Sequence, residues 1–187
     1  MDSPVDKLFA DHKALLAFLA EKGELSHQTT AAAVFGKSLL LGIASFFESR
    51  IQEIVTAFIH AKTKGDAAVL AFAKKKGIER QYHTWFDWKT QSANSFFALF
   101  GQAFGEECKK LVRESAELQE GIVAFLDLGN TRNELVHLNF VTFVLEKTPD
   151  EVFALYKKAL TFITWLEQRL PGEEKKTEPN AVGSAGM

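Results

Sequence analysis

The sequence predicts an all-α fold, an antiparallel bundle of four to five helices with a long second helix and one additional short helix. No segment alternates apolar and polar residues over the length of a half-buried strand. Helix-capping signals stand near both ends of the chain, where Ser3 precedes Pro4 and Thr148 precedes Pro149. Residues 26–62 contain no proline, so one long helix can run through them.

A glycine separates the first two predicted helices. Apolar residues at helical spacing predict the first helix over about residues 4–21, ending near Gly23. The second covers about residues 26–62, and its apolar positions form a broad face, as expected of a helix packed on two neighbours. Its most apolar run, residues 31–47, is interrupted by Lys37, which favours a buried helix over a membrane span.

The middle of the chain predicts a short helix followed by an irregular connector. Asp66 is suited to cap a helix that runs to Lys76 and is closed by Gly77. Residues 78–91 are rich in aromatic side chains but have no clean period, which predicts a connector pinned by its aromatics. Phenylalanines then recur at every fourth position, a pattern that favours core packing over a platform for stacking bases. They are Phe96, Phe100 and Phe104.

Two further helices complete the predicted bundle. Ser115 is suited to cap the first of them. Gly129 and Asn130 in its middle lower helix propensity and favour a bend. The capping box that begins at Thr148 starts the final helix, and Pro171 ends it.

Length and composition are those of one domain. The 187 residues are 47% hydrophobic, enough to bury one core, which predicts a single helical domain over residues 1–170. Residues 171–187 are polar, small and charged, so we expect a disordered tail. The single cysteine, Cys108, excludes an internal disulfide framework and fits a reducing compartment. The polar N-terminus shows no targeting pattern, so we expect a cytoplasmic protein without a membrane partner.

The net charge of −2 hides an uneven distribution. Residues 62–113 hold ten Lys or Arg against five Asp or Glu, a local balance of +5 that leaves −7 for the rest of the chain. Such asymmetry favours a surface for a polyanion such as RNA, but a solvated helix face gives the same count. The candidate RNA-binding residues are Lys74, Lys75, Lys76, Arg80, Lys109 and Lys110.

Residues 129–137 place an arginine, an amide and an imidazole in an apolar helical run. On a helix with about 100° per residue, Arg132 and Asn133 point into the apolar arc, and His137 lies at its edge. We expect that arc to be buried. Its apolar members are Leu118, Ile122, Phe125, Leu126, Val136 and Phe140. A guanidinium in such a seam needs a partner or a ligand, because an unpaired buried charge is strongly unfavourable.

Other chemical signatures are missing from the sequence. It contains no glycine-rich phosphate loop, no Gly-x-Ser-x-Gly elbow and no CxxC or HExxH spacing, so we expect neither a cofactor nor a metal. The remaining histidines are scattered, and no role is expected for any of them. They are His12, His27, His60 and His83.

The run Arg132-Asn133-Glu134-Leu135-Val136-His137 resembles the Arg-x4-6-His motif of the HEPN superfamily. Two further segments, Phe46-Phe47-Glu48-Ser49-Arg50-Ile51 and Leu99-Phe100-Gly101, resemble the RiboL-PSP type of HEPN domain found in prokaryotic defence and toxin systems. The likeness spans most of residues 5–170, and the six-residue motif is its sharpest part.

The resemblance implies a homodimer in which two motifs face each other and form a metal-independent endoribonuclease site. Arg132 and His137 would be catalytic, and Asn133 and Glu48 would have supporting roles. It implies RNA as substrate, with tRNA as a candidate, and a cognate antitoxin or defence-system partner. Asn139 stands where family toxins silenced by adenylylation carry tyrosine, so we do not expect that regulation.

Three interpretations of the motif remain open at this point. Arg132 and His137 could form a nuclease site, or belong to a non-catalytic HEPN module for dimerisation or nucleotide binding. In an unrelated helical adaptor they would instead form a sealed polar network with Glu48 or Glu134. A nuclease requires that solvent reach both side chains.

Overall fold

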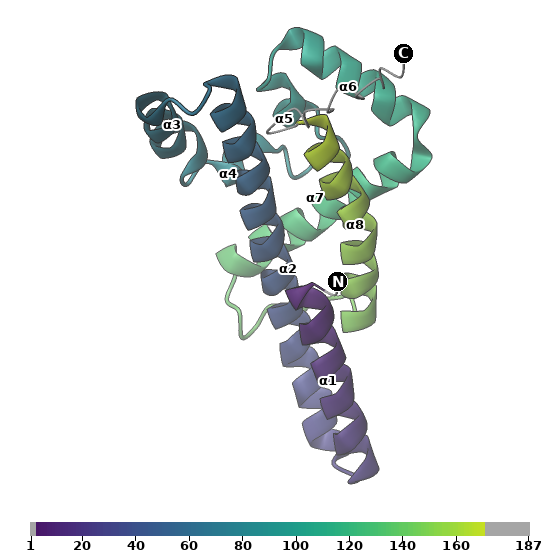
Figure 1. The fold of residues 1–187 in the computed structure, drawn as a ribbon. Helices are drawn as coiled ribbons and strands as arrows, with labels where there is room; N and C mark the ends of the chain where they lie inside the picture. Colours follow the sequence, from purple (N-terminus) through teal and green to yellow (C-terminus); the bar gives the residue numbers. More distant parts are fainter. Residues whose placement is uncertain (1–2, 171–187) are drawn as a thin grey trace, which may run out of the picture.

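The computed structural model describes residues 3–170, and this part of the chain is helical without a strand (Figure 1). Its longer helices are α1 (Pro4–Glu21), α2 (Leu25–Lys62), α6 (Gln102–Glu114), α7 (Ala116–His137) and α8 (Pro149–Arg169). Its short helices are α3 (Ala67–Ala73), α4 (Tyr82–Trp85) and α5 (Asn94–Ala98). The prediction of an all-α bundle with a long second helix is confirmed. Pro171 and the predicted tail lie outside the described residues.

α1 and α2 form a hairpin whose far end projects beyond the other helices (Figure 1). Ser3 caps α1 in a reciprocal box with Asp6, as its sequence position predicts. The Ser3 hydroxyl also lies 2.6 Å from the Tyr156 hydroxyl, which joins the start of α1 to α8. Gly23 turns the chain between the two helices with a φ of +74°, a conformation that favours glycine.

α2 is long and apolar enough to cross a membrane by length and composition alone, and 33% of its most apolar window is buried. The core helix of a soluble protein passes the same test. Here α2 packs against α1, α7 and α8. Within this packing Leu39, Leu40 and Ile43 are fully buried, so the middle of α2 serves as a core helix.

The predicted end of the short third helix is wrong. Asp66 caps α3 by accepting a hydrogen bond from the Val69 amide at 2.9 Å, but α3 ends at Ala73. A π-helical turn, η1 (Lys74–Ile78), follows and contains Gly77. Ile78, the last residue of this turn, is buried in the core.

Aromatic side chains fill the core where α2, α7, α8 and the connector meet. The Phe125 ring of α7 lies 5.7 Å from that of Phe47 on α2 and 5.2 Å from that of Phe162 on α8. From the connector, Phe86 stacks on Phe96 with centroids 4.7 Å apart. Phe96 is fully buried, which confirms core packing for the first of the spaced phenylalanines. The other two, Phe100 and Phe104, are partly buried against the core. Gly101, at a φ of +100°, separates α5 from α6.

The last two helices begin where the capping signals predict. The Ser115 side chain accepts from the Leu118 amide at the start of α7, and Thr148 forms a capping box with Glu151 at the start of α8. α7 continues through Gly129 and Asn130 to His137. α7 and α8 pack closely at Gly121, where an added Cβ would lie 3.0 Å from the Lys158 carbonyl oxygen.

Candidate functional site

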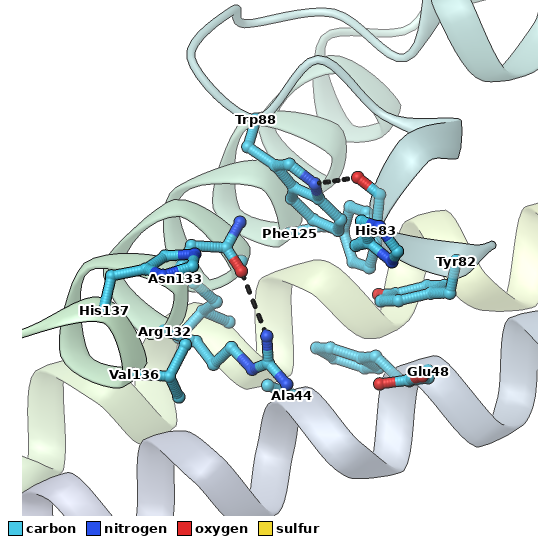
Figure 2. A pocket seen from close by; sticks show the side chains of 13 residues that line it. Ala44, Glu48, Tyr82, His83, Trp88, Phe125, Arg132, Asn133, Val136 and His137 are labelled. Atoms are coloured by element: carbon cyan, nitrogen blue, oxygen red, sulfur yellow. Dashed lines mark hydrogen bonds between the residues drawn. The ribbon is translucent and has the colours of Figure 1, made fainter. Parts of the chain in front are cut away.

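The C-terminal part of α7, the middle of α2 and the connector line a cavity of about 340 Å³ (Figure 2). Its polar and charged lining is Glu48 from α2, Tyr82, His83 and Trp88 from the connector segment, and Arg132, Asn133 and His137 from α7. The structure therefore brings Glu48 together with the three motif residues, although it lies far from them in the sequence. A volume of this size holds a small-molecule group.

Arg132 reaches into this cavity without an ion-pair partner among the described residues. It is partly buried, and its Nη1 donates to the Asn133 Oδ1 at 3.1 Å (Figure 2). Neither carboxylate considered as its structural partner pairs with it. Glu134 accepts from the Asn130 amide at 2.8 Å, and Glu48 accepts from the Gln52 amide at 3.4 Å. A guanidinium with unused donors beside open space is suited to bind an anion.

His137 ends α7 at the rim of the cavity. Its side chain is exposed and makes no hydrogen bond with the described residues. It also lines a neighbouring hollow together with Trp88 and Leu138. Solvent and a polymeric substrate can therefore reach the imidazole, as proton transfer to a substrate requires.

The buried apolar arc predicted for α7 is wrong in its last part. The helix ends at His137 because the chain becomes extended at Leu138, so Phe140 lies beyond the helix and is 40% exposed. Val136 is 45% exposed at the cavity. Arg132 and Asn133 consequently face an open cavity instead of a sealed apolar seam.

Asn133 lies between the other two motif side chains (Figure 2). Its carbonyl oxygen accepts from Arg132 and so restrains the guanidinium. No hydrogen bond joins Asn133 to His137 among the described residues. Among the described residues, the hydrogen bond of the Asn133 side chain is therefore with Arg132.

A family model described as RiboL-PSP-HEPN matches residues 6–170. The chain belongs to the RiboL-PSP-HEPN family. No curated protein and no solved structure matches the chain. The family match covers almost the whole described region. It agrees with the resemblance of the Arg132–His137 motif and with the all-α architecture.

The cavity of this HEPN domain depends on a close contact between Trp88 and Gly129. A Cβ added at Gly129 would lie 2.1 Å from the Trp88 ring, so the indole occupies the space of a side chain. The Trp88 Nε1 donates to the His83 carbonyl oxygen at 2.9 Å, which fixes the ring over α7 (Figure 2). The sequence did not indicate that Trp88 and His83 line the cavity. Only the glycine inside a helical pattern could have signalled the contact.

Tyr82 forms another side of the cavity. Burial raises the pKa of the Tyr82 hydroxyl, the Glu48 carboxylate raises it further, and the Arg132 guanidinium opposes them. The side chain therefore remains a neutral phenol at physiological pH. Sequence reasoning assigned Tyr82 to an aromatic connector and gave no sign that it lies in a cavity with Glu48 and Arg132.

The six predicted RNA-binding residues do not gather into one surface. Those of the 74–80 segment are exposed beside α3, whereas Lys109 and Lys110 lie on α6, at a separate corner of the molecule (Figure 1). The α6 lysines already form ion pairs, Lys109 with Glu106 at 2.7 Å and Lys110 with Glu114 at 3.9 Å. None of the six lines the cavity. Among the described residues, no cluster of three His, Cys, Asp or Glu has the spacing of a metal site.

Proposed function

We propose that this HEPN domain is a metal-independent endoribonuclease whose site is completed by a second copy of the chain. The observation that carries the proposal is Arg132, which has no carboxylate partner among the described residues and shares one cavity with Asn133 and His137. A structural network would satisfy the guanidinium internally, because an unmet charge lowers stability. An RNA phosphate supplies the missing anion.

The proposed reaction is an internal transfer of the phosphoryl group. His137 of one protomer accepts the proton of the ribose 2′-hydroxyl, and the 2′ oxygen attacks the adjacent phosphorus. Arg132 stabilises the negative charge of the pentavalent intermediate. The bond from phosphorus to the 5′ oxygen breaks, and the second His137 protonates the departing oxygen. The products are a 2′,3′-cyclic phosphate and a 5′-hydroxyl.

An exposed apolar surface beside the motif supports the homodimer. The side chains that follow the motif are 40–82% exposed, and Val136 within it is 45% exposed. They are Leu138, Phe140, Val141 and Val144. Apolar side chains clustered along one stretch favour a protein interface. A two-fold contact through this surface brings a second Arg132 and His137 to the first pair.

Two measurements test the proposal. Purified protein incubated with total tRNA in EDTA is expected to release fragments that end in a 2′,3′-cyclic phosphate. Sedimentation at micromolar concentration is expected to give the mass of a dimer. A strict monomer with and without RNA contradicts the composite site. A folded dimer that cleaves no RNA favours the non-catalytic HEPN module for dimerisation or nucleotide binding.

The cellular role we propose is cytoplasmic RNA cleavage in toxin-antitoxin or anti-phage defence, with a cognate antitoxin or defence-system partner. Its support is the RiboL-PSP-HEPN family membership. Expression of the chain alone is expected to arrest bacterial growth, and co-expression of the neighbouring gene is expected to relieve the arrest. Equal arrest by His137→Ala contradicts this role.

A further inference from the structure

The cavity holds two side chains of opposite charge that do not pair with each other. Glu48 enters from α2 and Arg132 from α7 (Figure 2). No ion pair joins either of them to a described residue. Glu48 accepts only a long hydrogen bond from Gln52 at 3.4 Å, and Arg132 donates only to Asn133. The cavity therefore offers a pair of acceptor oxygens at one place and a cationic fork at another.

Aromatic side chains line the same cavity as these two charged groups. The Trp88 ring lies 5.6 Å from that of Tyr82 and 5.7 Å from that of Phe125. Trp88 is held in place by its hydrogen bond to His83 and by its contact with Gly129. A fixed aromatic wall beside polar groups suits a flat ring that carries hydrogen-bonding edges. Proteins bind unstacked nucleobases in this manner.

The chemistry of Glu48 selects among the bases. A carboxylate accepts hydrogen bonds through both oxygens and donates none. Guanine presents two adjacent donors, N1–H and N2–H, on its Watson–Crick edge. Adenine and cytosine place an acceptor beside their amino group, and uracil places its single donor between two carbonyl oxygens. A carboxylate in this position therefore favours guanine over the other three bases.

We propose that this cavity is a guanine-nucleotide subsite, in which Glu48 accepts from N1–H and N2–H of the base. The base lies against Trp88, and Arg132 binds the phosphate of the same nucleotide. Tyr82, whose hydroxyl makes no hydrogen bond with described residues, lies beside Glu48 and can donate to the base (Figure 2). The inference rests on the proposed function in one respect, because the phosphate held by Arg132 is then the scissile one. The ribonuclease would cleave next to guanosine.

Calorimetric titration of the full chain with 5′-GMP, 5′-IMP and 5′-AMP tests the subsite without any cleavage. Inosine lacks the N2 amino group, so IMP is expected to bind on the order of tenfold more weakly than GMP, as the loss of a hydrogen bond to a charged group implies. Glu48→Gln is expected to abolish the preference for GMP over AMP and leave the thermal midpoint nearly unchanged. Glu53→Gln, on the same helix outside the cavity, is expected to retain the preference.

Mapping cleavage on an RNA and on its inosine-substituted copy separates this inference from the proposed function. Cuts beside guanosine that weaken with inosine, and spread to other bases in Glu48→Gln, support the subsite in RNA. Cleavage without base preference overturns the subsite and leaves the ribonuclease standing. Selective GMP binding without any cleavage supports a site for free guanine nucleotides and overturns the ribonuclease. Equal binding of GMP and AMP by the wild type overturns the subsite in either form.

Discussion

The two halves of α7 share an apolar periodicity, but the stripe becomes exposed only in the second half. In the first half, Ile122, Phe125 and Leu126 are each 1% exposed against α2 and α8. In the second, Val136 is 45% exposed and His137 lies at the rim of a cavity. One helical stripe thus serves as core over part of its length and as the wall of a site over the rest.

A glycine in each half explains the difference. At Gly121 the backbone of α8 approaches α7, and two helix backbones in contact leave no space between them. At Gly129 the neighbour is the Trp88 side chain, which comes from the connector. The motif residues line the cavity beside this contact.

The largest expected effect distinguishes His137, in the open part of the molecule, from His12, in a packed part. His137→Ala is expected to lower tRNA cleavage about 100-fold or more, because the variant removes the proton-transfer group, with little change in stability. His12 is stacked on Phe35 with centroids 3.4 Å apart. His12→Ala is therefore expected to lower stability and to leave tRNA cleavage by the folded protein unchanged. Unchanged cleavage by folded His137→Ala contradicts the assignment of chemistry to this end of α7.

The pH dependence of stability checks the packed histidine. Burial lowers the pKa of His12 below its usual 6.5, and the nearby Lys13 charge lowers it further. The unfolded chain therefore binds a proton that the folded chain does not, so the stability present above about pH 6.5 is lost as the pH falls. His12→Phe keeps the ring contact and is expected to flatten the urea-denaturation profile between pH 7 and the folded pKa. An unaltered profile would show that His12 does not titrate against folding.

The two glycines provide a smaller contrast. Gly121→Ala is expected to lower the free energy of unfolding by about 1–3 kcal/mol, because the new methyl group meets the backbone at Lys158 and Phe162. Gly129→Ala is expected to displace Trp88, and in a Trp88→Ala background it should become neutral or stabilise by about 0.5–1 kcal/mol. Urea denaturation of the wild type, Gly121→Ala, Gly129→Ala, Trp88→Ala and the double variant measures both effects. The same loss from Gly129→Ala with and without Trp88 contradicts the proposed contact.

Charge reversal of the exposed lysines has the smallest expected effect. It tests whether residues outside the cavity contribute to RNA affinity. Reversal of Lys74, Lys75 and Lys76 to glutamate is expected to reduce the slope of log K against log salt by roughly 0.7 for each lost contact with single-stranded RNA. Lys110→Glu is the matched control, because this lysine already pairs with Glu114. An unchanged affinity and slope for the triple variant assigns those lysines to an ordinary solvated surface.

Local signals predict most of the fold correctly. Capping geometry is decided within four residues, so Ser3, Ser115 and Thr148 indicate the starts of α1, α7 and α8. The end of α3 was not predicted, because the π-helical turn that follows it carries Gly77 and ends at the buried Ile78. Burial of Ile78 depends on contacts with residues far away in the sequence, which a local sequence pattern does not reveal.

The site is only half predictable from the sequence for a similar reason. Arg132, Asn133 and His137 share a short motif and one helix face, so their proximity follows from helical spacing. Tyr82, His83 and Trp88 reach the cavity through an irregular connector, and no periodicity predicts where such a segment packs. The assumption that an apolar stripe continues as core also failed at Val136, which is 45% exposed and lines the cavity.

The most direct test of the account measures Arg132→Ala twice on one preparation, by tRNA cleavage in EDTA and by thermal unfolding. Arg132 has no ion pair among the described residues, so cleavage is expected to fall about 100-fold or more while the midpoint changes little. Arg132→Lys should not restore the rate, because an ammonium lacks the planar fork. A midpoint lowered by many degrees, with wild-type cleavage surviving in the folded fraction, would contradict the account and return Arg132 to a structural role.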